Sequence, residues 1–502
     1  MPSSSPAFQF TRSALADSTA ELAIFGVLQH PTSDEILKDT WLDGLESLSP
    51  GATEILAQEK FDGSRDKVIL LRNPKGTSGP ARIIVTGLGR AARLRPAGLT
   101  TALKAAFDRA FGVRDVSTVA LALPELELAA DSVILAAVDA THDAGYASRE
   151  AKKPGRSVAK VDLLVKGGIE EKPQALKESI AIATARAAAR DLTNMPPNVK
   201  RTSTLSERAQ GLAGLANVSV DVISDPEWIQ KNMPCFYTVA MGSLVTDPPK
   251  FIRVHYKPAN AKKRIILVGK SVIFDTGGYQ VKTDDYMNTM KADMTGGSMV
   301  LAAIEAFAKL EIQGIELAAY LAATPNMIDA YAMLPDSIVD TTCGKKVEIR
   351  HTDAEGRLTL IDAVAKACEE SPDLIITIAT LTGSAARAVG EAIALMGNND
   401  PLRDRLRDAA KLAGDPVQTL DIWDEDFEDI KSKLDGADII NTSQNKNRGA
   451  QSACAFVMSG LTREIPLLHL DIAGADMTKD EKATGIGIKA VLKFLIAESQ
   501  LI

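Results

Sequence analysis

The chain has 502 residues, of which 45% are hydrophobic and 24% charged, a composition typical of a folded globular protein. This length exceeds what a single compact core usually holds, so we expect two or three domains. The net charge of −8 argues against a nucleic-acid partner, since phosphate binding needs a basic surface.

The four cysteines lie far apart and include no CxxC pair, which disfavours a disulfide framework or a cysteine zinc site. They are Cys235, Cys343, Cys368 and Cys454. The N-terminal segment lacks the long apolar run of a secretory signal. No uncharged apolar run reaches the roughly 18–20 residues of a membrane span. We therefore expect a cytoplasmic protein with free thiols and no membrane partner.

The first third of the chain alternates short apolar runs with segments of helical periodicity. The predicted strands are residues 21–29, 67–73, 81–89, 117–124 and 160–168. The predicted helices are residues 96–112 and 126–146. Alternation of this kind indicates an α/β layer with a largely parallel sheet.

Residues 171–198 predict one long helix, because the segment is rich in alanine and is ended by Pro196 and Pro197. We expect this helix to connect a non-catalytic N-terminal α/β domain of residues 1–170 to a catalytic domain of residues 199–502. The predicted fold class is therefore α/β, with two domains that each contain a mostly parallel or mixed sheet flanked by helices.

The second half alternates again. Its predicted strands are residues 218–224, 250–258, 263–271, 315–326, 345–352, 373–383 and 466–474. Its predicted helices are residues 296–310, 356–370, 383–395, 449–461 and 485–499. Charged residues gather where strands give way to helices, which is where open α/β sheets build their sites.

Four carboxylates lie on short glycine-containing connections in this half. They are Asp275, Asp293, Asp353 and Glu355. Divalent cations need fixed negative charge, and one carboxylate can bridge two ions, so four can hold a pair of ions roughly 3.5–4 Å apart. In an extended segment, Asp353 and Glu355 would point to the same side. This pattern predicts a two-metal hydrolase site.

Three cations occupy the same segments. Lys270 can either form a salt bridge with a carboxylate or, beside a dication, lose its proton and become a metal ligand. The residues leave both roles open. Lys282 and Arg357 are expected to stay cationic, so that they can polarise a carbonyl, stabilise an oxyanion or hold a small anion.

Three motifs give the pattern its specificity: VGKSVIFDTGG (268–278), MKADMTGGS (290–298) and HTDAEGRL (351–358). Together they resemble the signatures of the cytosolic leucyl aminopeptidase family, whose members are di-zinc exopeptidases. The resemblance covers about residues 180–500.

The resemblance implies two divalent ions per subunit. Lys270, Asp275, Asp293 and Glu355 match the ligands of the tighter site. Asp275, Asp353 and Glu355 match those of the more exchangeable site, so that Asp275 and Glu355 would bridge. The ions implied are Zn²⁺ or Mn²⁺, with Mg²⁺ and Co²⁺ as further candidates for the exchangeable site.

The resemblance also assigns catalytic and binding roles. Lys282 matches the lysine that polarises the scissile carbonyl, and Arg357 matches the arginine that holds a bicarbonate as general base. The residues that match the pocket for the first residue of the substrate are Met290, Thr380, Leu381, Gly383 and Ala473. The implied protein is a homohexameric aminopeptidase that hydrolyses the N-terminal bond of peptides through a metal-activated water.

The sequence departs from the family pattern beside these positions. His351 replaces an asparagine and is expected to line the site without binding metal. Tyr279 and Gln280 replace small or apolar residues. Asp476 lies near the pocket for the first residue, where it would favour basic or polar substrates if it faces that pocket, and otherwise is solvated or caps the next segment.

Two other hypotheses stay open. A family member with little activity could serve a structural or DNA-binding regulatory role, although the intact ligand set and the acidic charge count against it. A different two-metal hydrolase, such as a phosphoesterase, usually has several histidine ligands. This chain has five histidines, and only His351 lies in the motifs.

Overall fold

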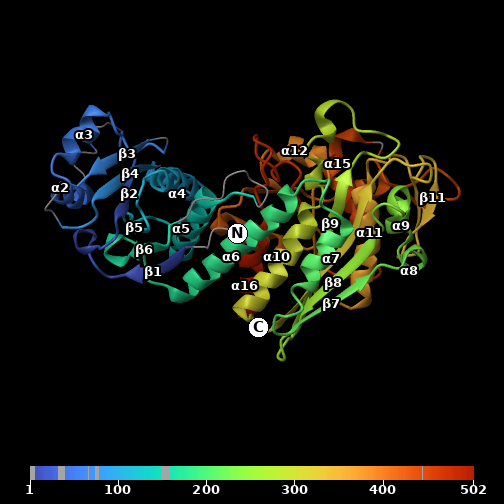
Figure 1. The fold of residues 1–502 in the computed structure, drawn as a ribbon. Coiled ribbons are helices and arrows are strands. Elements are labelled where there is room, and N and C mark those ends of the chain that lie inside the picture. The colour runs from blue at the N-terminus through green and yellow to red at the C-terminus, as the bar shows by residue number, and fades with distance from the viewer. Residues whose placement is uncertain are drawn as a thin grey trace. The chain divides into compact units, whose positions relative to one another are not determined.

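The computed structural model describes residues 6–31, 35, 40–65, 67–73, 78–148, 158–443 and 445–502. The chain forms two compact units. The first comprises Met1–Thr184 with Leu412–Gly414, and the second comprises Ala185–Lys411 with Asp415–Ile502. The division falls inside one continuous helix, α6 (Pro173–Asn194). Each unit contains a β-sheet flanked by helices (Figure 1), which confirms the predicted α/β fold class.

The first unit contains a six-stranded sheet in the order β1-β6-β5-β2-β4-β3. Its strands are β1 (Ala7–Thr11), β2 (Leu22–Leu28), β3 (Val68–Arg72), β4 (Arg82–Gly89), β5 (Thr118–Ala122) and β6 (Lys160–Leu164). All neighbours pair in parallel except β3 and β4. The sheet is thus mostly parallel, as the alternation of strand and helix patterns predicted.

Successive side chains of β2 face opposite layers of helices. Leu22 and Ile24 pack in an apolar cluster with α4 (Pro96–Phe111) and α5 (Ala130–Gly145). Ala23 and Phe25 pack in a second cluster with α2 (Asp43–Leu48) and α3 (Ala52–Gln58). A strand covered on both faces reads as a continuous apolar run, which is the pattern of residues 21–29.

The second unit contains an eight-stranded mixed sheet in the order β15-β14-β17-β13-β9-β10-β8-β7. Its strands are β7 (Val218–Ile223), β8 (Lys250–Tyr256), β9 (Lys263–Asp275), β10 (Ile315–Asn326), β13 (Leu374–Ala379), β14 (Ile393–Gly397), β15 (Val417–Thr419) and β17 (Leu467–Asp471). A small sheet contains β11 (Ile338–Asp340), β12 (Lys346–Glu348) and β16 (Ile439–Ile440). The central strand β9 pairs in parallel with β10 and β13.

The helices that follow α6 are α7 (Thr202–Gln210), α8 (Pro226–Asn232), α9 (Pro234–Ala240), α10 (Thr295–Leu310), α11 (Glu355–Glu369), α12 (Gly383–Val389), α13 (Asp400–Ala413), α14 (Asp424–Glu428), α15 (Gly449–Met458) and α16 (Ile488–Gln500). Helix α10 packs against β9, α7 and α16 (Figure 1). Helix α11 packs against β9 from the other face, beside α9 and α15.

Alternation along β9 separates these two layers. Ile266 and Val268 lie in an apolar cluster with Leu360 of α11. Gly269 instead lies against the backbone of Gly296 at the start of α10, where a Cβ atom on Gly269 would stand 2.5 Å from the Gly296 carbonyl oxygen. Because side chains alternate along a strand, the side chain of the next residue, Lys270, points to the α11 face.

Two sequence predictions in this unit were wrong in part. The helix predicted over residues 383–395 ends at Val389, and residues Ile393–Gly397 form strand β14. Gly390 ends the helix with φ +66°, a backbone angle that favours glycine, and the apolar run behind it is too short to distinguish helix from strand. The strand predicted over residues 345–352 is confined to Lys346–Glu348.

Candidate metal centre

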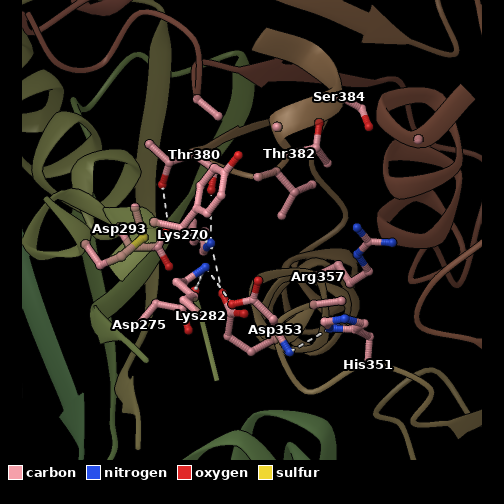
Figure 2. A pocket seen from close by; sticks show the side chains of 18 of the residues that line it. Lys270, Asp275, Lys282, Asp293, His351, Asp353, Arg357, Thr380, Thr382 and Ser384 are labelled. Atoms are coloured by element: carbon pink, nitrogen blue, oxygen red, sulfur yellow. Dashed lines mark hydrogen bonds and ion pairs between the residues drawn. The ribbon is translucent and has the colours of Figure 1, made fainter. Parts of the chain in front are cut away.

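A pocket of about 970 Å³ opens beyond the carboxyl ends of β9, β13 and β17. All twelve of the predicted site residues line it: Lys270, Asp275, Lys282, Met290, Asp293, Asp353, Glu355, Arg357, Thr380, Leu381, Gly383 and Ala473. They come from stretches that are far apart in the sequence, so the fold of the second unit brings the three motifs and the segments around Thr380 and Ala473 together at one edge of the sheet (Figure 2).

Three buried carboxylates form the centre of this pocket. Asp275 ends β9, Asp293 precedes α10, and Glu355 is the first residue of α11. Each offers an oxygen, and these three oxygens all lie within 4.8 Å of one another. Oδ2 of Asp293 and Oε2 of Glu355 are buried and have no hydrogen-bond partner. An all-oxygen cluster with unsatisfied lone pairs fits a hard divalent cation.

Burial and mutual repulsion perturb the pKa values of these carboxyl groups. Burial, reinforced by Glu355, raises the pKa of Asp275 to about 7. Burial also raises the pKa of Asp293 well above its usual value. Burial alone would raise the pKa of Glu355 too, but Lys270 and Lys282 outweigh it and hold that pKa below its usual value. A strongly perturbed cluster in a pocket is typical of a functional site.

Lys270 reaches this cluster from β9. Its Nζ lies 2.7 Å from Oδ1 of Asp293 and 3.0 Å from Oε1 of Glu355, and it donates a hydrogen bond of 3.0 Å to the carbonyl oxygen of Thr380. Burial opposes its charge, but Asp293 and Glu355 outweigh burial and raise its pKa. Of the two roles that the sequence left open for Lys270, the structure contains the ion pair with carboxylates.

Lys282 lies between the two remaining carboxylates (Figure 2). Its Nζ is 2.8 Å from Oδ2 of Asp275 and 2.5 Å from Oδ1 of Asp353. Burial opposes its charge, but Asp275 and Glu355 outweigh it and raise its pKa. The turn that positions Lys282 uses Gly277 at φ +89°, a conformation open to glycine. Lys282 is thus a fixed cation on the pocket side of the carboxylates.

The segment that carries Asp353 is not extended, so the condition under which Asp353 and Glu355 were expected to point to the same side is not met. Residues 352–353 form a turn, in which Ala354 N donates to the carbonyl oxygen of His351, and Glu355 begins helix α11. The turn brings both carboxylates into the pocket without a strand. His351 lines the pocket, and its Nδ1 accepts a hydrogen bond of 3.2 Å from the backbone N–H of Asp353.

Arg357 lies two residues into α11 and is buried. Its Nε has no hydrogen-bond partner in the structure. Burial lowers the pKa of its guanidinium to about 10, although Glu355 and Asp471 oppose this shift. Figure 2 shows Arg357 and His351 among the side chains that line the pocket. A buried guanidinium with a free donor is suited to hold a small anion.

Several residues outside the predicted metal ligands hold the site in place, and of these Thr380 and Leu381 were expected only to line the pocket. Nδ2 of Asn326, at the end of β10, donates to Oδ1 of Asp275 at 2.8 Å and to the carbonyl oxygen of Thr352 at 3.1 Å. The hydroxyl of Thr380 donates to Oδ1 of Asp293 at 2.8 Å. Asp471 accepts from Leu381 N at 3.0 Å. No local pattern marks these residues, since each partner is distant in the sequence.

The residues at which the chain departs from the family pattern lie in different surroundings. Gln280 and Asp476 line the pocket together with His351. Tyr279 does not, since 43% of it is exposed and its hydroxyl donates to the carbonyl oxygen of Asp329 at 2.9 Å. Tyr279 is therefore not part of the pocket wall, although its neighbour Gln280 is.

Among the described residues, no helix is long and apolar enough to cross a membrane.

Two family models match the chain. The catalytic domain of the cytosol aminopeptidase family matches residues 187–492, and the N-terminal domain of the same family matches residues 42–154. Curated relatives include a probable cytosol aminopeptidase of Persephonella marina, 33% identical over 473 residues, which are 91% of this chain and 93% of the relative. Another, of Parasynechococcus marenigrum, is 32% identical over 97% of this chain and 99% of the relative.

Solved structures agree with these matches. A mutant of tomato leucine aminopeptidase superposes with a TM-score of 0.84 at 26% identity, covering 99% of this chain and 98% of that chain. The bottromycin maturation enzyme BotP in complex with Mn superposes with a TM-score of 0.81 at 25% identity, covering 96% of this chain and 100% of that chain.

Proposed function

The chain belongs to the cytosol aminopeptidase family and is an aminopeptidase of the hydrolase class, and from this premise we propose that it removes the first residue of peptides by means of water activated between two divalent ions. The observation that carries the proposal is the buried cluster of Asp275, Asp293 and Glu355, whose oxygens lie within 4.8 Å of one another. Lys270 and Lys282 pair with these carboxylates, but buried oxygens of Asp293 and Glu355 have no hydrogen-bond partner, and such oxygens are costly to bury without a further cation.

The donor set of this chain fits two ions. Lys270, Asp275, Asp293 and Glu355 would hold one ion, and Asp275, Asp353 and Glu355 would hold the more exchangeable one. The unpartnered buried oxygens of Asp293 and Glu355 support this assignment. When bound, two divalent ions would lower the pKa of a shared water and polarise the scissile carbonyl. We propose Zn²⁺ or Mn²⁺, with Mg²⁺ or Co²⁺ as alternatives in the exchangeable site.

The side chains around the metal centre would supply the other catalytic and binding roles. Lys282 presents an ammonium group to the substrate carbonyl and stabilises the negative charge that develops on its oxygen. Arg357 would hold a bicarbonate through its free guanidinium donors, and this anion would accept the proton of the attacking water. Met290, Thr380, Leu381, Gly383 and Ala473 would line the pocket for the side chain of the first residue.

We further propose that the protein is a homohexamer of the cytoplasm, as the family resemblance implies. Light scattering on the purified protein tests the assembly, since a hexamer of 53.4 kDa chains differs sixfold in mass from a monomer. A monomeric or dimeric mass would overturn this part of the proposal.

The activity is tested with an aminoacyl amide and with the same amide acetylated at its amino group. We expect hydrolysis of the free amine only, loss of hydrolysis after chelation, and recovery when Zn²⁺ or Mn²⁺ is added back. Metal analysis should find two ions per chain in the active protein. Absence of hydrolysis with every metal would instead support a family member kept for a structural or DNA-binding role.

A further inference from the structure

One acidic side chain in the pocket is not used by the metal centre. Asp476 lines the same pocket as Met290, Ala473 and the carboxylate cluster. Unlike Asp275 and Asp293, which have lysine partners, Asp476 forms no ion pair with any described residue. Its charge is therefore available to a molecule that enters the pocket.

The backbone that carries Asp476 is held in place. Thr484 N donates to the carbonyl oxygen of Asp476 at 2.8 Å, and the hydroxyl of Thr484 donates to the same oxygen at 3.1 Å. Met477 pairs with Ala483 in an isolated β-bridge. Gly474 lies so close to α12 that an added Cβ atom would stand 2.4 Å from the Gly390 carbonyl oxygen. A group on such a rigid support can discriminate between ligands.

The surroundings of Asp476 suit a long side chain with a cationic end. Met290, Leu381 and Met477 supply apolar surface in the same pocket, and lysine and arginine bury their methylene stems on such surface while keeping the charged end near a polar group. Burial, reinforced by Asp471 and opposed by hydrogen bonds from the backbone N–H groups of Asp476 and Met477, raises the pKa of Asp476 to about 7, so a bound cation would favour its charged form.

Besides the three cations assigned to the proposed metal centre, Arg387 also lines the pocket and would suit an acidic ligand. Arg387 is exposed, and its Nη2 donates to the hydroxyl of Ser384 at 3.0 Å. An acidic first residue would have to bind there. Because Arg387 is solvated and Asp476 is partly buried, the charge of Asp476 is the less screened of the two.

We propose that Asp476 makes this enzyme prefer substrates whose first residue is lysine or arginine. The proposal rests on the proposed function, since it assigns the pocket that holds the first side chain. It names Asp476 as a specificity residue that contacts the substrate side chain.

The test compares kcat/KM for the aminomethylcoumarin derivatives of lysine, arginine, leucine and glutamate. We expect the wild-type enzyme to cleave the lysine and arginine substrates at least tenfold better than the glutamate substrate. Asp476→Asn should lower kcat/KM for lysine and arginine tenfold or more and change leucine less than threefold. Asp476→Glu should keep the basic preference.

Asp480→Asn is the matched control, because Asp480 is exposed, lies four residues away and does not line the pocket. It should leave all four values unchanged. A wild-type enzyme that cleaves leucine at least tenfold better than lysine and arginine overturns the proposal, and this comparison needs no variant. An equal loss of kcat/KM for all four substrates in Asp476→Asn also overturns the proposal. Such a loss would mean that Asp476 binds the substrate's α-amino group or is needed for folding. Failure to cleave any substrate with any metal overturns the proposed function as well.

Discussion

The side chain of Lys270 lies directly over Gly356: a Cβ atom on Gly356 would stand 2.4 Å from Cε of Lys270 and 2.8 Å from its Nζ. Gly356 is the second residue of helix α11. The glycine is required because the lysine passes over it on its way to Asp293 and Glu355.

Gly356→Ala should therefore displace Lys270 without breaking the fold, since the end of a lysine side chain moves easily. We expect kcat/KM to fall about 100-fold, because a shift of about 1 Å in a catalytic centre can have that effect. Metal content measured by mass spectrometry should fall with it. Gly214→Ala is the control, since a Cβ atom there would meet nothing within 4 Å. Unchanged activity in Gly356→Ala would show that Lys270 has no part in the centre.

Lys282→Ala should strongly lower turnover while metal stays bound. Its removal takes away a cation that lies 2.8 Å from Asp275, so the carboxylates attract metal no less strongly. Loss of one preorganised charge usually lowers kcat by about 10²–10³-fold. The test measures kcat and metal content on the same sample of Lys282→Ala. Loss of metal together with activity would contradict this role. Lys309→Ala, which removes a half-exposed lysine, should behave as wild type.

Arg357→Ala should remove any dependence of the rate on bicarbonate. The buried Nε of Arg357 is unpartnered, which makes it a donor for a small anion. In buffer freed of carbon dioxide, added bicarbonate should raise kcat of the wild-type enzyme and leave the variant at the lower rate. Arg350→Ala changes an exposed arginine and should retain the stimulation. A wild-type enzyme indifferent to bicarbonate would remove the basis for assigning a bicarbonate to Arg357.

Asn326→Ala should weaken metal binding although Asn326 is not a ligand. Its amide orients Asp275 through a hydrogen bond of 2.8 Å, and loss of such an outer contact typically costs about 10–100-fold in metal affinity. Titration calorimetry with Mn²⁺ measures the change. Asn288→Ala, at an exposed residue outside the pocket, serves as control. Equal affinities in the two variants would mean that Asp275 keeps its position unaided.

Metal affinity should fall as the pH falls through about 7. Burial and Glu355 raise the pKa of Asp275 to about 7, so below that pH the carboxyl group holds a proton that the metal must displace. Each displaced proton lowers the apparent affinity about tenfold per pH unit. Titrations in two buffers of different ionisation enthalpy count the protons released. An affinity that is constant from pH 6 to pH 8 would contradict this linkage.

The same titration can exclude ligation by a neutral Lys270. Asp275 is ionised at pH 8.5, whereas the pKa of Lys270 is raised by its carboxylate neighbours. Ligation by a neutral Lys270 therefore requires that one proton still be released at pH 8.5. No release at that pH would leave Lys270 as the partner of an ion pair.

Sequence patterns predicted the features of this molecule that depend on residues close to one another in the sequence. The parallel sheet of the first unit follows from strand and helix periodicity, and the three motifs contain every carboxylate of the centre. The contacts of Asn326 could not be predicted, because its partner Asp275 lies 51 residues away on another strand. The position of Asp476 was equally open, since only the folded turn brings it into the pocket.

The backbone pairing of β9 affects how firmly Lys270 and Asp275 are held. This strand supplies Lys270 and Asp275 and is hydrogen-bonded to β10 on one side and to β13 on the other. Amide protons that lie between paired strands in a protein core exchange with solvent more slowly than those at the ends of the pairing. Lys270 and Asp275 lie beyond the part of β9 that pairs with β13 and are held by Ala322 and Asn326 of β10, so we expect their backbone amides to exchange with solvent faster than those of residues 265–269, which have strands on both sides.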